Sequence, residues 1–564
     1  MTPELLLQHF NRISEAPDAI ARLRRFILDL AVRGKLVEQD PSDEPAGELL
    51  KRIQAEKARL VKEGKIKEPK ILFKTVSNPP YDLPATWRWV PLGITVNSHL
   101  GGGTPSKNNS TYWDGDIYWA SVKDIGKGKY VDSTIDRISE AGLKDSSSNR
   151  IPPGSLIVVT RMGLGKISIN RVPIAINQDL RALFLSSLAS IDYYYNFFKT
   201  HGFDGSGLTV KGIKVEELLN TPFPLPPLAE QQRIVTKVDE LMALCDQLEA
   251  ERNQREAHRD KLVAASLNRI STTTAEEAKD AARFHLNLLP RLTTKPEHIK
   301  QLRQTILNLA VRGKLVEQDP NDEPATELLK RIQAEKERLV KELGQKKEAP
   351  LPAIDFEQAP FDLPLGWTWA RFPELGKFGR GKSKHRPRND SVLFVEGSHL
   401  LIQTGDVARS QGIIRTYTNK YNDTGLAQSL KWPAGTLCIT IAANIADSGI
   451  LSFDACFPDS VVGFVPASMF ENARYFEYFV RTAKADLLAF APATAQKNIN
   501  LEILNSVMIP LPPLAEQQRI VAKVDQLMGL CDQLEAQLVT TTADSRRLLE
   551  AVLHDALKNG LVAA

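Results

Sequence analysis

Two short runs in this chain of 564 residues have the residue types and spacing of enzymatic sites. Gly376–Ser383 matches the pattern G-x-x-x-x-G-K-S, in which a loop between a buried strand and a helix holds phosphate groups. The preceding residues, Arg371–Glu374, are not typical of a buried strand, and Pro387 would break the required helix in its first turns. The sequence therefore disfavours nucleotide hydrolysis at this run.

The second run, Asn78–Tyr81, spells the N-P-P-Y signature with which adenine-N6 methyltransferases hold the target amino group. A methyltransferase also needs a glycine-rich cofactor loop after an early strand, and no such arrangement accompanies this run. The nine histidines have no zinc-ligand spacing, and no serine nucleophile motif occurs. We expect no catalytic residue, metal site or bound cofactor, which indicates a binding subunit. The alternative is a self-contained enzyme that uses 376–383 for ATP or 78–81 for methyl transfer.

A better interpretation of the phosphate-loop region is electrostatic. Five basic residues lie within nine positions there, among glycines that let the backbone approach a ligand closely: Arg380, Lys382, Lys384, Arg386 and Arg388. Such a cluster suits the phosphates of DNA, because each neutralised contact releases a counterion. A solvated basic loop is the alternative. An earlier segment offers a milder version, in which the candidates are Thr104, Ser106, Lys107 and the isolated Arg161.

Other candidate residues are of types that read base edges in the major groove of DNA. They are Gln178 in the first half of the chain and Gln403, Thr404 and Asp406 in the second half. Lys211 and Lys497 are further candidates, because each stands in a Lys-x-Ile sequence ahead of the same Leu-Pro-Pro. For every one of these residues, ordinary turn or surface chemistry is the alternative.

The candidates lie in two segments that are framed by near-identical blocks. Ile20–Lys65 returns from Ile299 with few changes, and Leu225–Ala250 returns as Leu511–Ala536 with three changes. The first block has two apolar stripes at helical spacing, and Gly34 stands between them where a left-handed cap belongs. This block therefore predicts a helical hairpin in each copy.

The other repeated block predicts a long helix. Its apolar residues step by four and three, which is the heptad spacing of a coiled coil: Ile234, Val238, Leu241, Cys245 and Leu248. One apolar seam needs one partner, and the second copy of the block is the predicted partner. Arg252, Arg255 and Arg259 interrupt the first seam, so we expect the pairing to loosen there or a second protein to dock.

The order of the blocks indicates a ring that has been opened at one point. A long helix followed by a hairpin occupies the centre of the chain, whereas a hairpin begins the chain and a long helix ends it. Joining the termini would regenerate a second central region. The simplest fold is a closed pseudo-twofold body in which the two long helices run antiparallel.

The framed segments are predicted to share one fold. Both begin with Leu-Pro-x-x-Trp-x-Trp, and their unlike interiors mix short β-rich runs with glycine turns. The predicted fold class is α+β, with one fold used for two specificities. The expected domains are a helical hairpin at 1–75, an insert at 76–224, a long helix plus hairpin at 225–349, a second insert at 350–510, and a long helix at 511–564.

Bulk composition limits the alternatives. The net charge of +4 is too small to indicate a nucleic-acid partner by itself, so that inference depends on local clusters. The four cysteines form no C-x-x-C pair and are expected to be buried free thiols. No signal peptide and no apolar run near the roughly 18 residues of a membrane span is found, so a cytoplasmic protein is expected. A pure coiled-coil scaffold would explain the helices but not the two globules.

The repeated blocks resemble the specificity subunit of type I restriction-modification systems. The resemblance is carried by Pro224–Val235 with its copy at 510–521, by Ala31–Leu36 with its copy at 310–315, and by the paired Leu-Pro-x-x-Trp-x-Trp openings. Gly102–Ser106 and Ile402–Asp406 are similar to target-recognition motifs of that family. The resemblance covers essentially the whole chain, including the order of its blocks.

The resemblance implies two target recognition domains separated by a long antiparallel two-helix coiled coil. Each domain would read one half of a bipartite, asymmetric site in double-stranded DNA, and the helices would fix the number of unread base pairs. The implied partners are two modification (methyltransferase) subunits and two restriction (translocase/nuclease) subunits. No association with a membrane is implied. S-adenosylmethionine, ATP and Mg²⁺ would be used by those partners for adenine-N6 methylation and restriction, and not by this chain.

Overall fold

The computed structural model describes residues 16–68, 71–202, 212–343, 351, 353–354, 357, 359–442, 445–489, 499 and 501–559. The chain divides into two compact units. Unit 1 comprises Met1–Arg255 and Thr541–Ala564, and unit 2 comprises Glu256–Thr540. Each unit contains a helical hairpin, one insert and a part of both long helices.

The predicted hairpins are present in both units. Unit 1 has α2 (Ala19–Val32) and α3 (Ala46–Lys62), and unit 2 has α11 (Pro296–Val311) and α12 (Ala325–Leu343). In both, the first helix is followed by the glycine that the sequence marked as a cap: Gly34 has φ +68° and Gly313 has φ +65°. A backbone with positive φ favours glycine because a Cβ would be strained there.

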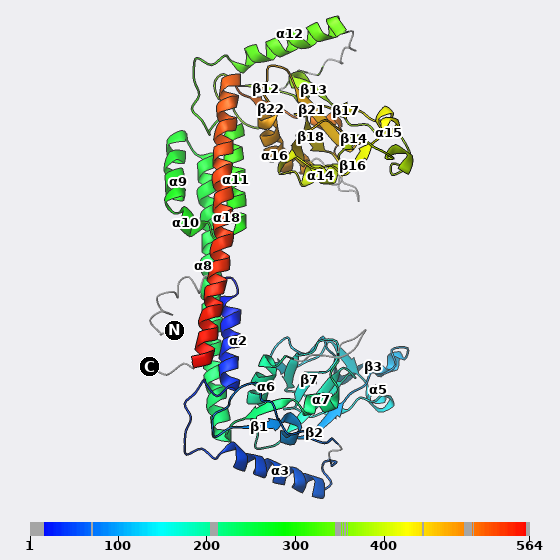
Figure 1. Cartoon of the computed structure of the whole chain (residues 1–564), viewed down its shortest axis with the longest axis vertical. Helices are drawn as coiled ribbons and strands as arrows, with labels where there is room; N and C mark the ends of the chain where they lie inside the picture. The colour runs from blue at the N-terminus through cyan, green and yellow to red at the C-terminus, as the bar shows by residue number, and fades with distance from the viewer. Residues whose placement is uncertain are drawn as a thin grey trace. The chain divides into compact units, whose positions relative to one another are not determined.

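The long helices are α8 (Leu228–Thr272) and α18 (Leu514–Asn559). Because α8 begins in unit 1 and ends in unit 2, and α18 does the reverse, each unit holds the first part of one helix and the last part of the other. Figure 1 shows α2 alongside both long helices in unit 1 and α11 alongside both in unit 2.

Contacts along the hairpins give the direction of the long helices. In unit 1, α2 is antiparallel to α8, since Arg24 bonds to Asp246 (2.6 Å) whereas Arg252 reaches back to the carbonyl of Ala16 (3.0 Å). The same helix, α2, is parallel to α18. The ion pair of Asp18 with Arg546 (3.5 Å) comes first and the bond from Lys35 to the carbonyl of Leu557 (2.8 Å) comes later. The two long helices are therefore antiparallel within unit 1.

Unit 2 repeats this arrangement. From the start of α11 to the residues that follow it, the contacts with α8 move to higher residue numbers, from Lys295–Asp260 (3.0 Å) to Lys314–Ser271 (3.2 Å). The contacts with α18 move to lower residue numbers, from Arg303–Asp532 (2.7 Å) to Gln318–Glu516 (3.1 Å). The antiparallel direction predicted from the order of the blocks is therefore confirmed within each unit.

The sequence predicted that the apolar seam of each long helix packs against the other long helix. For the first half of each seam this prediction is wrong. Ile234, Val238 and Cys245 belong to a core made with α2, α3 and the first insert, and that core includes no residue of α18. Ile520, Val524 and Cys531 belong to the corresponding core of unit 2, which includes no residue of α8. The hairpin and the insert cover the seam because they also present wide apolar faces, which heptad spacing by itself does not reveal.

The arginines that interrupt the seam are used inside the chain. Arg252 donates to the carbonyls of Ala16 and Pro17, which precede α2. Arg259 forms an ion pair with Glu256 in the next part of α8. Beyond these arginines the apolar stripe resumes with Val263, Leu267 and Ile270, which pack with α9 (Ala275–Asn287), α10 (Leu289–Leu292) and α11.

The first insert contains a five-stranded sheet of order β2-β10-β7-β8-β4, a four-stranded sheet of order β5-β3-β9-β6 and the pair β1-β11. Its strands are β1 (Arg88–Pro91), β2 (Val96–Gly101), β3 (Trp113–Ala120), β4 (Tyr130–Val131), β5 (Asp136–Ile138), β6 (Arg150–Ile151), β7 (Leu156–Val159), β8 (Ile167–Asn170), β9 (Ile174–Ile176), β10 (Leu180–Leu185) and β11 (Pro222–Leu225). Its helices are α4 (Leu92–Thr95), η1 (Ser110–Tyr112), α5 (Glu140–Asp145), α6 (Ile191–Thr200) and α7 (Val215–Leu219).

The second insert has the same topology, with sheets of order β13-β21-β18-β19-β15 and β16-β14-β20-β17 and the pair β12-β22. Its strands are β12 (Thr368–Ala370), β13 (Gly376–Arg380), β14 (His399–Leu401), β15 (Gly412–Ile414), β16 (Asn419–Tyr421), β17 (Lys431–Trp432), β18 (Leu437–Thr440), β19 (Ser448–Leu451), β20 (Ala455–Cys456), β21 (Val461–Pro466) and β22 (Ile509–Leu511). Its helices are α13 (Phe372–Leu375), η3 (Ser391–Leu393), α14 (Thr404–Ala408), α15 (Asp423–Ala427), α16 (Arg474–Ala489) and α17 (Leu501–Ser506). The prediction of one shared fold for two unlike sequences is confirmed.

Each insert is joined to its long helix by the same buried bond. The indole of Trp87 donates to Glu230 of α8 (2.8 Å), and the indole of Trp367 donates to Glu516 of α18 (3.0 Å). Both carboxylates are about 1% exposed, and burial raises their pKa above the ordinary value. The repeated Leu-Pro-x-x-Trp opening of each insert therefore serves to attach it to the repeated Glu-Gln-Gln of the helix.

The remaining bulk expectations concern cysteines and membranes. All four cysteines are buried free thiols, as the sequence predicted. Among the described residues, no helix has the length and hydropathy needed to span a bilayer.

Candidate nucleic-acid interface

In the first insert, the candidate residues lie on loops that the two sheets bring together. The loop after β2 is bound to the end of β9, because the amide of Gly103 donates to the carbonyl of Ile176 (3.1 Å). One residue after Gly103 and two residues after Ile176, the hydroxyl of Thr104 donates to the side-chain carbonyl of Gln178. Both side chains are exposed, so this pair forms part of the surface.

Glycine at position 102 permits this approach. A Cβ on Gly102 would stand 1.7 Å from the carbonyl oxygen of Ile176, a distance that no side chain can relieve because the obstacle is backbone. The rest of the loop is exposed at Ser106 and Lys107, and the indole of Trp113 donates to the carbonyl of Ser106 (3.2 Å). Thr104, Ser106 and Lys107 thus lie on one loop, and the sequence did not reveal that β9 holds this loop.

Arg161 joins the same surface from the loop between β7 and β8. Its guanidinium lies 3.8 Å from Asp179, next to Gln178, and its backbone pairs with Gly212. Met162 beside it has φ +59° and is 66% exposed, an unusual conformation for a residue with a long side chain. Lys211 lies outside the described residues.

The phosphate-loop pattern of the second insert does not form a phosphate loop. Gly376–Arg380 is the edge strand β13, which pairs antiparallel with β21, and the next helical turn, η3, begins only at Ser391. A phosphate-binding loop needs a helix N-terminus directly after its glycines. The structure therefore argues against a phosphate loop, and the electrostatic interpretation of this run stays a prediction.

The basic loop after β13 is held as its counterpart is in the first insert. The amide of Lys382 donates to the carbonyl of Phe457 (3.0 Å), and a Cβ on Gly381 would lie 2.3 Å from that carbonyl. The amides of Lys384 and His385 donate to the side chain of Gln428 (2.7 and 3.1 Å). The loop is thus fixed by its backbone, which leaves side chains available for a ligand.

The five cations of this loop are not equivalent. The guanidinium of Arg386 donates to the carbonyls of Ser383 and His385 (both 2.8 Å), and Arg388 forms an ion pair with Asp459 (2.7 Å). The charged groups of Arg380, Lys382 and Lys384 have no partner among the described residues. These last three are the better candidates for phosphate contacts, and Arg386 mainly supports the loop.

Gln403, Thr404 and Asp406 surround the start of α14, and their roles differ. Gln403 is exposed, and Thr404 is partly exposed, whereas Asp406 is only 2% exposed. The carboxylate of Asp406 accepts from the amide of Gln403 (2.9 Å), the hydroxyl of Thr418 and the guanidinium of Arg409 (3.0 Å). Asp406 caps the helix and is not placed to read a base, so we withdraw it from the candidates. Lys497 lies outside the described residues.

The comparison of the inserts reveals residues that sequence reasoning missed. Asp124 accepts from the amide of Ser121 (2.8 Å) as Asp406 does from Gln403. Ser121 and the exposed Lys123 therefore occupy the positions of Gln403 and Gly405. The signal available in the sequence was the aspartate three residues after Ser121 and after Gln403, but nothing marked it as a shared cap.

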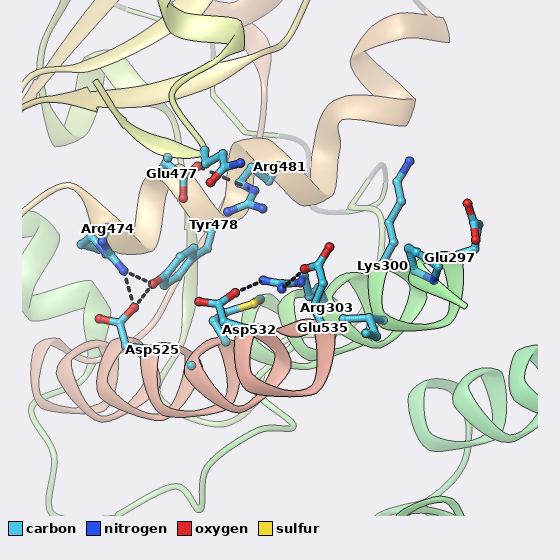
Figure 2. Close-up of a pocket in the computed structure, with 16 residues that line it drawn as sticks. Glu297, Lys300, Arg303, Arg474, Glu477, Tyr478, Arg481, Asp525, Asp532 and Glu535 are labelled. Atoms are coloured by element: carbon cyan, nitrogen blue, oxygen red, sulfur yellow. Dashed lines mark hydrogen bonds and ion pairs between the residues drawn. The ribbon is translucent and has the colours of Figure 1, made fainter. Parts of the chain in front are cut away.

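A cavity of about 710 Å³ lies in unit 2, where α11, α16 and α18 meet the loop before β15. Figure 2 shows Arg474 and Tyr478 of α16 pointing toward Asp525 of α18, and Arg303 pointing toward Asp532 and Glu535. These charged groups are paired within the chain. Among the residues in Figure 2, Glu477 is the most deeply buried acid, and burial raises its pKa to about 7.

This pKa predicts a pH-dependent stability for unit 2. Because the folded state raises the pKa of Glu477 from 4.5 to about 7, it binds more protons than the unfolded chain in this window. Stability is therefore lost as the pH rises from about 4.5 to about 7. We expect Glu477→Gln to match the wild type near pH 4 and to be more stable near pH 8 by up to about 3 kcal/mol. Urea unfolding of both proteins at the two pH values measures this difference, and equal differences at both would contradict it.

The corresponding region of unit 1, between the first insert and α8, has different contacts. Lys129 precedes β4, as Gln411 precedes β15, and its ammonium lies 2.9 Å from Asp192 and 3.8 Å from Asp239. Lys129 thereby links α6 of the first insert to α8. The two units thus share a fold while differing in the contacts between insert and helix.

Comparison with known proteins agrees with this duplicated architecture. Residues 84–255 and 399–540 match the model of the type I restriction modification DNA specificity domain. The chain is 32% identical over 95% of its length to the Type I restriction enzyme EcoEI specificity subunit of Escherichia coli, and 32% identical over 95% to the EcoAI specificity subunit of the same species, covering 94% of each. A crystal structure of the HsdS subunit from Thermoanaerobacter tengcongensis is 20% identical, with a TM-score of 0.43 over 86% of this chain and 100% of that one. The chain belongs to the family of type I restriction-modification DNA specificity subunits.

Proposed function

We propose that each insert reads one half of a bipartite, asymmetric DNA sequence, with 76–224 and 350–510 as the two recognition domains. The observation that carries this proposal is one fold presented twice with unlike loop side chains at equivalent positions. Identical readers would recognise a symmetric site, whereas different readers on equivalent frames recognise two different half-sites. The antiparallel long helices would then set the number of unread base pairs between them.

The proposed contacts divide into phosphate and base contacts. The unpaired cations Arg380, Lys382 and Lys384 would hold the backbone of the DNA, together with Lys107 in the first insert. The exposed Thr104, Gln178 and Gln403 and the partly exposed Thr404 are polar groups that suit base edges. Lys211, Lys497, Ser106, Arg161, Arg386 and Arg388 complete the proposed set.

The catalytic work would belong to partner subunits. We propose that two modification subunits and two restriction subunits assemble with this chain in the cytoplasm, where they methylate adenine N6 or cut unmodified DNA. S-adenosylmethionine, ATP and Mg²⁺ would be bound by those partners. The names of the E. coli relatives, specificity subunits of type I restriction enzymes, support this division of labour.

Sequencing of methylated adenines tests the proposal directly. The chain produced with its modification partner should methylate one bipartite sequence, and exchanging 360–510 for the insert of another family member should change only one half of it. An altered length of α8 should change the gap and neither half. Methylation without a defined sequence, or a change in both halves on exchanging one insert, would refute the proposal.

Lys382→Ala tests the phosphate assignment. Because Lys382 lies on the basic loop and its ammonium has no partner in the described part of the chain, we expect weaker binding to all DNA sequences and a salt dependence of log K that is shallower by about 0.9. Fluorescence anisotropy of the assembled complex at several KCl concentrations measures both. Lys431→Ala removes the same charge from an ion pair with Asp454 (3.6 Å) in the same insert, and its slope should equal that of the wild type.

A further inference from the structure

One position of the shared fold carries different recognition chemistry in the two inserts. The carbonyl of Ile176 accepts from the loop amide of Gly103 (3.1 Å), and that of Phe457 accepts from the loop amide of Lys382 (3.0 Å). Ile176 and Phe457 are therefore equivalent. Two residues after each of them stand Gln178 and Asp459, so these two side chains occupy the same place in the two inserts.

The first insert presents a neutral amide at this place. Gln178 is exposed, and its carbonyl oxygen accepts from the hydroxyl of Thr104. A carbonyl oxygen has two lone pairs, so it can accept a second hydrogen bond while Thr104 holds it in position. The amide nitrogen has no partner among the described residues. Gln178 thus offers one acceptor and one donor side by side.

The second insert presents a guanidinium at the same place. One terminal nitrogen of Arg388 donates to Asp459 (2.7 Å), and both side chains are nearly half exposed. A guanidinium has five N–H donors in a planar fork, so a carboxylate on one side leaves other donors for a ligand. Asp459 therefore holds Arg388 in a fixed orientation while the guanidinium stays accessible to solvent.

We propose that this position discriminates bases: Gln178 reads an adenine in one half-site, and Arg388, oriented by Asp459, reads a guanine in the other. The inference rests on the proposed function. A glutamine amide matches the N6 donor and N7 acceptor of adenine, and an arginine fork matches the O6 and N7 acceptors of guanine. In this assignment Arg388 differs from Arg380, Lys382 and Lys384, which contact phosphates.

Arg388→Lys separates base reading from phosphate binding, because lysine keeps the charge and loses the fork. The complex with the modification partner is first used to define the methylated sequence. Duplexes with each base pair at each position of both half-sites then give relative methylation rates for the wild type and for Arg388→Lys, Asp459→Asn and Gln178→Ala.

The inference requires that Arg388→Lys reduce the preference for one G·C pair in one half-site by about 5- to 150-fold, with an unchanged salt slope. Asp459→Asn should weaken the same preference, and Gln178→Ala should weaken the preference for an A·T pair in the other half-site. Unchanged preferences in Arg388→Lys and Gln178→Ala, or a uniform loss for all duplexes, would overturn it. A wild-type complex that methylates no defined sequence would instead refute the underlying function.

Discussion

Replacement of Trp367 by alanine is expected to lower the free energy of unfolding of unit 2 by about 3–5 kcal/mol, the range for a large buried aromatic residue. The indole is 7% exposed and packs near Tyr475 of α16. Its N–H is also the donor to Glu516, so the substitution removes one hydrogen bond from a buried carboxylate, which keeps the bond from the side-chain amide of Gln318 (3.1 Å). An under-satisfied buried acid adds to the cost of the cavity.

Hydrogen exchange measured by mass spectrometry tests this expectation by unit. Peptides that cover β18 in unit 2 should exchange faster in Trp367→Ala, whereas peptides that cover β7 in unit 1 should not change. Trp87→Ala should give the reverse pattern, because its indole binds Glu230 in the same way. Leu365→Ala is the control, since that side chain is 91% exposed and its loss should have little effect. Equally faster hydrogen exchange in both units would contradict the expectation that the Trp87–Glu230 and Trp367–Glu516 bonds stabilise their units independently.

Gly102→Ala and Gly381→Ala are each expected to reduce recognition of one half-site by about 10- to 100-fold, which corresponds to the roughly 1–3 kcal/mol of a forced overlap. The new Cβ would lie 1.7 Å from the carbonyl of Ile176 in the first case and 2.3 Å from that of Phe457 in the second. Both obstacles are backbone atoms, so the loop itself must move away. The side chains proposed to contact DNA would move with it.

The chain offers a matched control for each substitution. Gly128 lies in the first insert with nothing within 4 Å of an added Cβ, and Gly379 lies in β13 with its nearest neighbour, Trp432, at 3.8 Å. Gly128→Ala and Gly379→Ala should therefore behave as the wild type. Methylation rates on duplexes with one or the other half-site altered measure the effect. A loss of selectivity in both half-sites from one glycine would contradict the assignment of one reader to each half.

The duplicated joint explains how two unlike readers are attached in the same manner. Arg233 binds Asp43 at 2.6 Å in unit 1, and Arg519 binds Asp322 at 2.7 Å in unit 2, beside the buried glutamates. These residues belong to the repeated blocks, so any insert that begins with the Leu-Pro-x-x-Trp phrase meets the same surface. Exchange of inserts is physically reasonable because the attachment does not depend on the interior of the insert.

Much of the architecture followed from local signals in the sequence. The helical hairpins were predictable because a glycine follows the first apolar stripe in each copy, and glycine readily takes the left-handed conformation of a helix cap. Gly34 and Gly313 both take this conformation. The antiparallel direction of the long helices followed from the order of the repeats, since a chain that passes through two equivalent units must traverse the second helix in reverse. The basic loop after β13 was visible as a charge cluster because its residues are close in sequence.

Tertiary structure decided what those residues do. Asp406 is of a residue type that can read bases, yet folding buries it as a helix cap. The guanidinium of Arg386 donates to the carbonyl of Ser383 in its own loop. The apolar seam of α8 packs against α2 and the first insert, because several surfaces of the chain can satisfy one heptad stripe. The equivalence of Gln178 with Asp459 depends on hydrogen bonds between β9 or β20 and distant loops. Sequence alone determined the repeated frame through short-range spacing, whereas the identity of the exposed readers arose only from long-range pairing of strands and loops.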